Sequence, residues 1–140
     1  MKIILASASP RRQEILTKAN IQYELIPSRV EEVFNHTLSV EDAVMDLAHQ
    51  KAKWVFDSNQ DDLVIGADTI VVVDNEVLGK PKDYQDAFRM LNKLQNNKHD
   101  VITGVALIKK DKTIKFYEKT KVFFKPMSHV DIDKYIEEEN

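Results

Sequence analysis

The stretch LVIGADTIVVV, residues 63–73, decides how the rest of the sequence is interpreted. Nearly every residue in it is apolar, which is typical of a strand buried in a protein core. The exception is Asp68, and a carboxylate in a dry core is costly unless it is paired with a cation, hydrogen-bonded or bound to a metal. We therefore interpret LVIGA and TIVVV as two strand segments with a functional break at Asp68, where Gly66 loosens the backbone.

The composition is that of a folded domain. The chain has 140 residues, 43% hydrophobic and 31% charged, which is enough for one domain with a core. It has no cysteine, which excludes disulfides and thiolate metal sites. No apolar run approaches the roughly 20 residues that span a bilayer, and the N-terminal run is too short for a signal peptide. We expect a cytoplasmic protein without membrane contact, and a net charge of −3 argues against a general nucleic-acid binder.

Strands and helices alternate around the central stretch, and a long hairpin follows. We expect strands at residues 2–6, 22–26 and 76–78, and a hairpin of 101–110 with 113–125. Helix starts are indicated by Ser9 with Pro10, by Ser39, by Asp83 and by Ser128, and the helix from Ser39 runs to about Phe56. This order predicts an α/β fold with a mixed twisted sheet and flanking helices.

The helix at residues 39–56 places a charge where an apolar residue is expected. Lys51 falls near the middle of the arc formed by Val40, Val44, Leu47, Ala48 and Val55. A lysine there must extend to solvent, pair with an acid or point at an anionic ligand. The helix alone leaves all three open.

Two of the three glycines of the chain lie near other candidate residues. Gly66 stands two residues before Asp68, Gly79 directly precedes Lys80, and Gly104 is the third. Glycine allows close approach of the backbone and unusual dihedral angles, or it serves turns and bulges. The sequence leaves these interpretations open.

Further charged and hydroxyl side chains gather in three short segments. SASPRR, residues 7–12, offers hydroxyls and guanidiniums at a helix start, where arginine matches phosphate oxygens in a bidentate way, although the same residues also fit a plain helix cap. GKPKD, residues 79–83, adds Lys80 and Lys82, and Glu31 and Glu32 follow the second strand. Carboxylates together with several cations are typical of divalent-metal phosphoryl chemistry.

These segments resemble the motifs of one family, the Maf proteins, which are nucleoside triphosphate pyrophosphatases first described as septum-formation inhibitors. The matching motifs occur in the family's order over essentially the whole chain: LASASPRR (5–12), VEE (30–32), AHQKAK (48–53), IGADTIVV (65–72), LGKPKD (78–83) and HDVITGVAL (99–107).

The resemblance implies hydrolysis of a nucleoside triphosphate between its α and β phosphates, yielding the monophosphate and pyrophosphate, with Mg²⁺ or Mn²⁺ required. It implies two α/β lobes around a cleft, similar to inosine triphosphate pyrophosphatases, and a homodimer. The expected partner is the nucleotide, with no nucleic acid. The GADT form, with Thr69 after the aspartate, resembles the branch that acts on dTTP and UTP.

The same resemblance assigns roles to individual residues. Asp68 is the expected proton acceptor, and Glu32 is expected to hold the metal together with Asp68. Phosphate binding is expected of Ser7, Arg11, Arg12, Lys51, Thr69 and Lys80.

The family pattern continues beyond YIEEEN with a DKAGAYGIQG-type motif that supplies a lysine and a glutamine to the site. We therefore expect residues 1–140 to be a single, C-terminally truncated domain of this type. One alternative is a nucleotide-binding or regulatory protein without turnover. A nucleic-acid-binding regulator fits the acidic balance poorly. A phosphatase with an aspartyl nucleophile needs a DxD motif that residues 63–73 lack.

Overall fold

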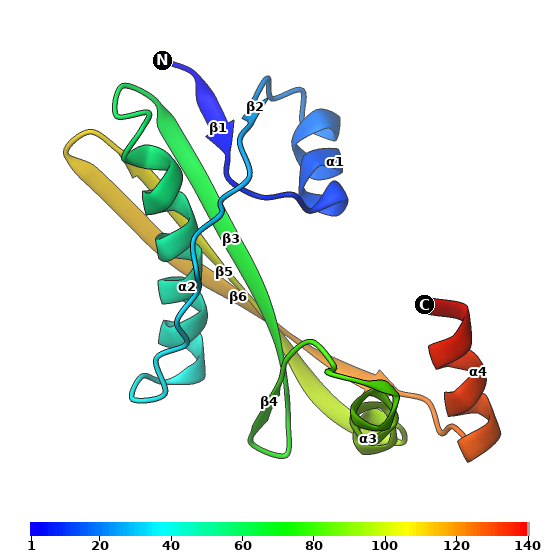
Figure 1. The fold of residues 1–140 in the computed structure, drawn as a ribbon. Coiled ribbons are helices and arrows are strands. Elements are labelled where there is room, and N and C mark those ends of the chain that lie inside the picture. Colours follow the sequence, from blue (N-terminus) through cyan, green and yellow to red (C-terminus); the bar gives the residue numbers. More distant parts are fainter. Residues whose placement is uncertain (140) are drawn as a thin grey trace. The chain divides into compact units, whose positions relative to one another are not determined.

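The computed structural model describes residues 1–139, which contain six strands and four helices (Figure 1). In chain order these are β1 (Ile3–Leu5), α1 (Pro10–Lys18), β2 (Glu24–Leu25), α2 (Val40–Phe56), β3 (Leu63–Val73), β4 (Glu76–Leu78), α3 (Tyr84–Leu94), β5 (Asn97–Lys109), β6 (Lys112–Phe124) and α4 (His129–Glu139). The strands form one sheet in the order β2-β1-β3-β5-β6, with β4 paired to β3.

The sheet is mixed, as the sequence predicts. Strand β1 runs parallel to both β2 and β3, with Ile4 opposite Val64 in the second pairing. Strands β3 and β4 are antiparallel and are joined by Asp74 and Asn75, which both have positive φ, as a tight hairpin turn requires. A two-residue connection likewise makes β5 and β6 an antiparallel hairpin.

The predicted break at Asp68 is wrong, because β3 runs without interruption from Leu63 to Val73. Successive side chains of a strand point to opposite faces, while the backbone makes the ladder of hydrogen bonds. The carboxylate of Asp68 therefore leaves the sheet on one face without disturbing the ladder. Gly66 does not have a positive φ, so no unusual dihedral angle occurs there.

The predicted helix starts are confirmed. The side chain of Ser9 accepts a hydrogen bond from the amide of Arg12, and Pro10 occupies the first turn of α1. The side chains of Ser39, Asp83 and Ser128 accept in the same way from the amides of residues 42, 86 and 131. These bonds satisfy amide groups that a helix start otherwise leaves unpaired.

The chain divides into two compact units. Unit 1 comprises Met1–Thr69 and Thr103–Glu118, and unit 2 comprises Ile70–Ile102 and the chain from Lys119 onward. Strands β3, β5 and β6 contribute residues to both units. Among residues 1–139, no helix combines the length and apolar character needed to cross a bilayer.

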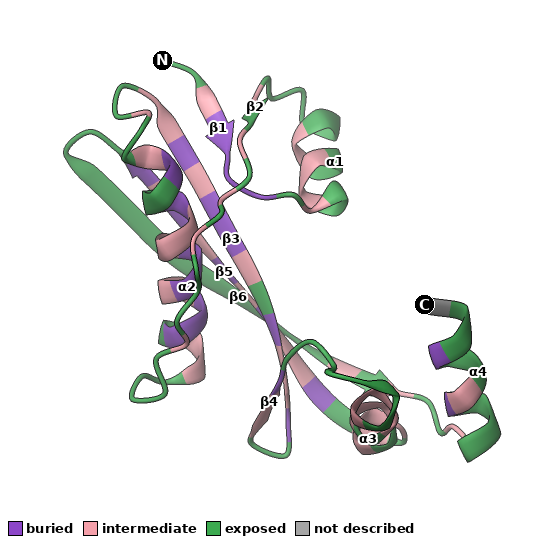
Figure 2. Cartoon of the chain, viewed as in Figure 1, coloured by how far each residue is buried: buried purple, intermediate pink, exposed green. Residues whose placement is uncertain are grey.

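The core of unit 1 lies between α2 and the sheet. Small and branched side chains pack there: Ile4, Ala6, Ala48, Ala52, Val55, Val64, Ala106 and Ile108. Figure 2 shows buried positions along α2 and β3, whereas β6 is exposed over most of its length. Helix α2 is therefore held by one side of the sheet, and its position decides what its side chains can reach.

Two glycines allow α2 to approach the strands closely. A Cβ atom added at Gly66 would meet the carbonyl oxygen of Ala48 and lie 2.8 Å from the backbone nitrogen of Ala52. A Cβ atom at Gly104 would lie 2.6 Å from the carbonyl oxygen of Val44. Both glycines thus serve close approach of a helix backbone, which is one of the two interpretations that the sequence leaves open.

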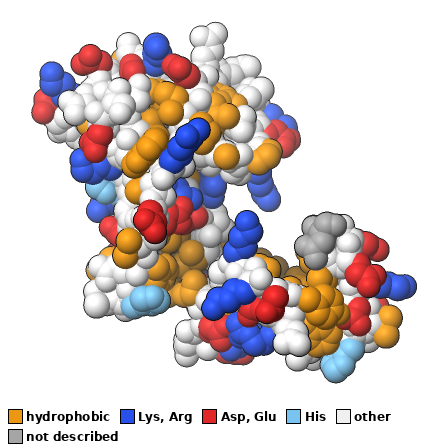
Figure 3. All heavy atoms as spheres, viewed as in Figure 1, with side chains coloured by type: hydrophobic (Ala, Val, Ile, Leu, Met, Phe, Trp, Pro, Cys, Tyr) orange, Lys and Arg blue, Asp and Glu red, His pale blue; other side chains and the backbone are white. Residues whose placement is uncertain are grey.

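Unit 2 contains the helices α3 and α4, the strand β4 and parts of β3, β5 and β6. Helices α3 and α4 contact each other, and Ile132 and Ile136 of α4 are buried. A cavity of about 490 Å³ is lined by apolar residues of both helices together with Leu78 and Gly79. On the face of the molecule in Figure 3, basic and acidic side chains are interspersed, and no extended region of one sign is in view.

We predict that Gly66→Ala lowers the free energy of unfolding by about 1–3 kcal/mol, because the added methyl group collides with backbone atoms that cannot rotate away. Urea denaturation measures the change. Gly79→Ala is the matched control, because nothing lies within 4 Å of a Cβ atom at Gly79 and its φ is not positive. A loss as large in the control as in Gly66→Ala would contradict the role assigned to close helix approach.

Candidate functional site

The first cluster of the candidate site joins an ammonium group to two carboxylates. The Lys51 Nζ atom lies 2.9 Å from Glu32 Oε1 and 3.3 Å from Asp68 Oδ1. The side chains of Lys51 and Asp68 are only 21% and 19% exposed, so this pairing is shielded from solvent more than an ordinary surface ion pair. Of the three alternatives for Lys51, the structure shows pairing with acids.

Asp68 is oriented by two donors at the same oxygen. Its Oδ1 atom forms the ion pair with Lys51 and accepts a hydrogen bond, at 3.0 Å, from the backbone amide of Thr69. No hydrogen bond to its Oδ2 atom occurs within the described part of the chain. The carboxylate is therefore fixed in direction and keeps one oxygen available for a further partner.

The second cluster surrounds the guanidinium group of Arg12. Its Nη1 atom donates to Ser7 Oγ at 3.3 Å, and its Nη2 atom donates to Thr69 Oγ1 at 2.9 Å. The Thr69 hydroxyl in turn lies 3.0 Å from the hydroxyl of Thr103 on β5. Ser7 is buried, and its Oγ atom also accepts from the amide of Ser9. Thr69 of β3 and Ser7 of the β1–α1 segment thus meet at one arginine, and Thr103 of β5 joins them through Thr69.

Arg12 keeps its charge uncompensated by any acid within the described chain. Its side-chain partners are hydroxyl groups, and none of its contacts among residues 1–139 is an ion pair. Ser7 Oγ already accepts two hydrogen bonds, so its own proton is left to donate. A positive group beside a hydroxyl donor is suited to an anion such as phosphate. Arg11 is exposed on α1 and contacts no acid in the described part of the chain.

The two clusters meet at consecutive residues of one strand. Asp68 belongs to the first cluster and Thr69 to the second. Neighbouring side chains of a strand point to opposite faces, so the acidic cluster lies on the α2 side and Arg12 approaches from the other side. Gly66, two residues before Asp68, lies against Ala48 and Ala52 of α2, which assigns the side of Asp68.

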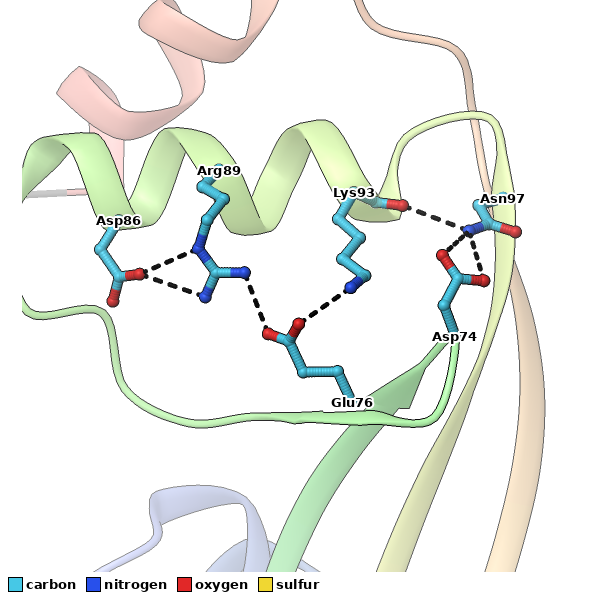
Figure 4. A network of polar contacts seen from close by, with 6 residues as sticks. All are labelled: Asp74, Glu76, Asp86, Arg89, Lys93 and Asn97. Atoms are coloured by element: carbon cyan, nitrogen blue, oxygen red, sulfur yellow. Dashed lines mark hydrogen bonds and ion pairs between the residues drawn. The ribbon is translucent and has the colours of Figure 1, made fainter.

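Lys80 belongs to unit 2, where it is exposed on the loop between β4 and α3. A network of ion pairs holds both ends of this loop (Figure 4). Arg89 donates to Glu76 of β4 at 3.0 Å and to Asp86 of α3 at 3.3 Å. Asp86 also accepts from the backbone amide of Lys82 at 3.0 Å. The loop is thereby anchored, while the Lys80 side chain has no partner among residues 1–139.

The acids of this network have lowered pKa values. The pKa of Glu76 lies below its usual value because Lys93 and then Arg89 donate hydrogen bonds to its carboxylate. The pKa of Asp86 is lowered mainly by the backbone amide of Lys82. Both acids are therefore more favourable in their charged form in the folded chain than in the unfolded chain.

A divalent metal is compatible with the donors of the first cluster. Among residues 1–139 no group of three or more acidic or imidazole side chains is arranged to hold a metal. Mg²⁺, however, is commonly bound through one or two carboxylates together with substrate phosphates and water. Glu32 and Asp68 are two such carboxylates held by one lysine, and their oxygen donors suit a hard cation.

Of the residues predicted from the sequence, the structure brings together Ser7, Arg12 and Thr69 in one cluster and Glu32, Lys51 and Asp68 in the other. Sequence reasoning missed Thr103 as a member. The signal available was its position directly before Gly104 in a strand. It also missed the Asp86–Arg89 pair, whose three-residue spacing on a predicted helix indicates an ion pair.

Comparison with known proteins identifies relatives along the whole chain. The family model described as "Maf-like protein" matches residues 2–140. A protein of Bacillus cereus named dTTP/UTP pyrophosphatase is 50% identical over 135 residues, which are 96% of this chain and 71% of the relative. A protein of the same name from Bacillus cytotoxicus is 49% identical with the same coverage.

Solved structures share the fold. A nucleoside-triphosphatase, dITP/XTP pyrophosphatase, from Mycobacterium abscessus superimposes with a TM-score of 0.57 at 18% identity, covering 86% of this chain and 73% of that one. The Ham1 protein of Staphylococcus aureus superimposes with a TM-score of 0.57 at 17% identity, covering 86% and 70%. At such identities the likeness concerns the fold, and it confirms the predicted similarity to that architecture.

We predict that Glu76→Gln destabilises the protein at pH 7 and that the difference from the wild type shrinks as the pH falls. A lowered folded-state pKa contributes stability above the unfolded value, near 4.5 for Glu76, and loses it as the pH falls through the folded value. Urea denaturation at pH 7 and pH 3 measures both differences.

The matched control is Glu137→Gln, an exposed acid of α4 outside the network. A deficit in Glu76→Gln that stays constant between the two pH values would contradict a role for the charged carboxylate.

Proposed function

The chain belongs to the Maf-like protein family, and from that premise we propose that it hydrolyses nucleoside triphosphates to the monophosphate and pyrophosphate, with dTTP and UTP as substrates. The observation that carries the proposal is the pair Asp68 and Thr69. An oriented carboxylate and a hydroxyl bonded to an uncompensated arginine stand side by side in sequence. Consecutive residues of β3 thus supply a base for water, on the face next to α2, and a hydroxyl bonded to the phosphate-binding arginine, on the other face.

Asp68 acts as the proton acceptor. Its Oδ1 atom is engaged by Lys51 and the Thr69 amide, so Oδ2 takes the proton of the attacking water. The water oxygen forms a bond to the α phosphorus while the bond from that phosphorus to the bridging oxygen breaks. Pyrophosphate leaves with the bridging oxygen, and the monophosphate retains the oxygen from water.

Cationic and hydroxyl groups bind the phosphates. Arg12 offers a guanidinium held in place by Ser7 and Thr69, which reduces the ordering needed when a nucleotide binds. Arg11 and Lys80 stay predicted phosphate ligands, since each is exposed and has no acidic partner in the described chain. Lys51 neutralises charge at the junction of the two carboxylates.

Glu32 and Asp68 would hold Mg²⁺ or Mn²⁺. When bound there, the ion supplies positive charge to the phosphate oxygens and lowers the cost of charge on the leaving pyrophosphate. Lys51 keeps the two carboxylates close together before any cation arrives, because like charges would otherwise separate. Homodimer formation, the lack of nucleic-acid binding, a cytoplasmic location and a single Maf-like domain stay predictions from the sequence.

We predict pyrophosphate release from dTTP and UTP in the presence of Mg²⁺ or Mn²⁺ and none after chelation with EDTA. A coupled pyrophosphate assay across a panel of nucleoside triphosphates measures it. Because the alternative is a nucleotide-binding protein without turnover, nucleotide binding is measured in parallel by calorimetry. Binding without pyrophosphate release from any member of the panel would favour that alternative.

We predict that Asp68→Asn lowers kcat by about 10²- to 10⁴-fold, because the amide no longer accepts a proton from water. Nucleotide affinity, measured by calorimetry, changes far less. Asp61→Asn serves as the control, since Asp61 is an exposed acid just before the same strand. Undiminished turnover in Asp68→Asn would remove this residue from the base role.

A further inference from the structure

The hydroxyl of Thr103 stands behind the hydroxyl of Thr69, 3.0 Å away on the neighbouring strand. We propose that Thr103 is a positioning residue: it donates its proton to Thr69 Oγ1 and thereby directs the Thr69 proton to a phosphate oxygen of the bound nucleotide. This inference rests on the proposed function of the same site and assigns a residue that the predicted site does not include.

The assignment follows from the number of hydrogen bonds that the Thr69 hydroxyl donates and accepts. A hydroxyl has one proton to donate and two lone pairs with which to accept. Arg12 has no acceptor atoms in its guanidinium, so its Nη2 contact at 2.9 Å occupies one lone pair of Thr69 Oγ1. The contact with Thr103 has two possible directions. Either Thr69 gives its proton to Thr103, or Thr103 donates and fills the second lone pair.

The two directions have different consequences for a ligand. If Thr69 donates to Thr103, its proton is used within the protein and a phosphate meets only the one remaining lone pair of Thr69 Oγ1. If Thr103 donates, both lone pairs of Thr69 are occupied and its proton must go outward. A phosphate oxygen drawn to the uncompensated charge of Arg12 accepts that proton in a charge-assisted hydrogen bond, which is stronger than the neutral bond between two hydroxyls. A bound anion therefore selects the second direction.

The packing of α2 on β5 determines the direction of the Thr103 side chain. The next residue, Gly104, lies directly under the backbone of α2 at Val44. Because side chains alternate along a strand, Thr103 points to the face opposite α2, where Thr69 and Arg12 also lie. Thr69 and Thr103 form a cross-strand pair, which is the arrangement in which two threonines hydrogen-bond. The helix contact thus sets the position of a hydroxyl on the far side of the sheet.

Both lone pairs of the Ser7 hydroxyl are also occupied, but here no second hydroxyl takes part. Its Oγ atom accepts from Arg12 Nη1 and from the Ser9 amide, which are both obligate donors. Its proton is therefore already directed away from these groups. Thr103 fills the second lone pair of Thr69 Oγ1, as the Ser9 amide fills the second lone pair of Ser7 Oγ. The guanidinium of Arg12 then lies between two hydroxyl groups that are both able to donate.

The test compares Thr103→Val, which removes the hydroxyl at nearly constant volume, with Thr103→Ser, which keeps it. We expect Thr103→Val to raise the KM for dTTP by about three- to tenfold, the value of one hydrogen bond, and to change kcat by less than about twofold. Thr103→Ser recovers most of the loss. Thr113→Val, the same substitution at an exposed position of β6, is the matched control with wild-type KM.

A double-mutant cycle with Thr69→Val separates positioning from general destabilisation. If Thr103 acts through Thr69, adding Thr103→Val to Thr69→Val changes KM no further. A wild-type KM in Thr103→Val, a loss in Thr103→Ser as large as in Thr103→Val, or a full additional loss in the double variant would overturn the proposal. Thermal unfolding accompanies each variant, and Thr103→Ala replaces Thr103→Val if the latter does not fold.

Calorimetric titration with inorganic pyrophosphate gives a readout that does not need turnover. The affinity for this probe is expected to fall by the same factor in Thr103→Val and to recover in Thr103→Ser. If the wild type releases no pyrophosphate from any nucleotide, the proposed hydrolysis fails. In that case the pyrophosphate affinities of the variants alone test whether Thr103 positions the Thr69 hydroxyl. Equal affinities in the wild type and Thr103→Val would overturn this role.

Discussion

The arrangement of the site depends on how closely α2 lies on the sheet. Gly66 and Gly104 present no side chain to the helix, and the facing helix residues include Ala48 and Ala52. Backbone therefore packs almost directly against backbone. At this separation the ammonium group of Lys51 reaches Asp68, two residues beyond Gly66 on the same face of β3. A larger residue at the contact would move the helix outward and separate the ammonium from the carboxylate.

The site consists of two clusters whose net charges have opposite sign. The cluster of Glu32, Lys51 and Asp68 has one more negative than positive charge, which favours a cation. The cluster around Arg12 has hydroxyl partners and a net positive charge, which favours an anion. A metal–triphosphate complex carries both kinds of charge. The strand positions 68 and 69 join the two clusters through a single peptide bond, so their spacing is set by covalent geometry and the sheet.

Much of this could be predicted because local rules and single anomalies are visible in a sequence. The helix caps follow from side-chain chemistry, and Lys51 and Asp68 stand out as charges among apolar residues. The sequence does not decide between the interpretations of Gly66 or assign a partner to Thr103, because both depend on which helix lies over the strand and which strands are neighbours. The predicted break at Asp68 is wrong for a related reason: an acid in an apolar run does not have to interrupt the backbone, because its side chain alone leaves the sheet.

Lys51 and Arg12 differ in the partners that a phosphate must displace in order to bind them. Lys51 is already engaged by two carboxylates, so a phosphate that drew it away would leave like charges on Glu32 and Asp68 uncompensated. A divalent ion between those carboxylates would supply the missing charge, which couples any phosphate contact of Lys51 to metal binding. Arg12 carries no such cost, since its partners are neutral hydroxyls that accept its hydrogen bonds without cancelling its charge. Of these two cations, Arg12 is therefore the one that a phosphate can bind without displacing an acid, and Lys51 serves first to keep the two carboxylates together.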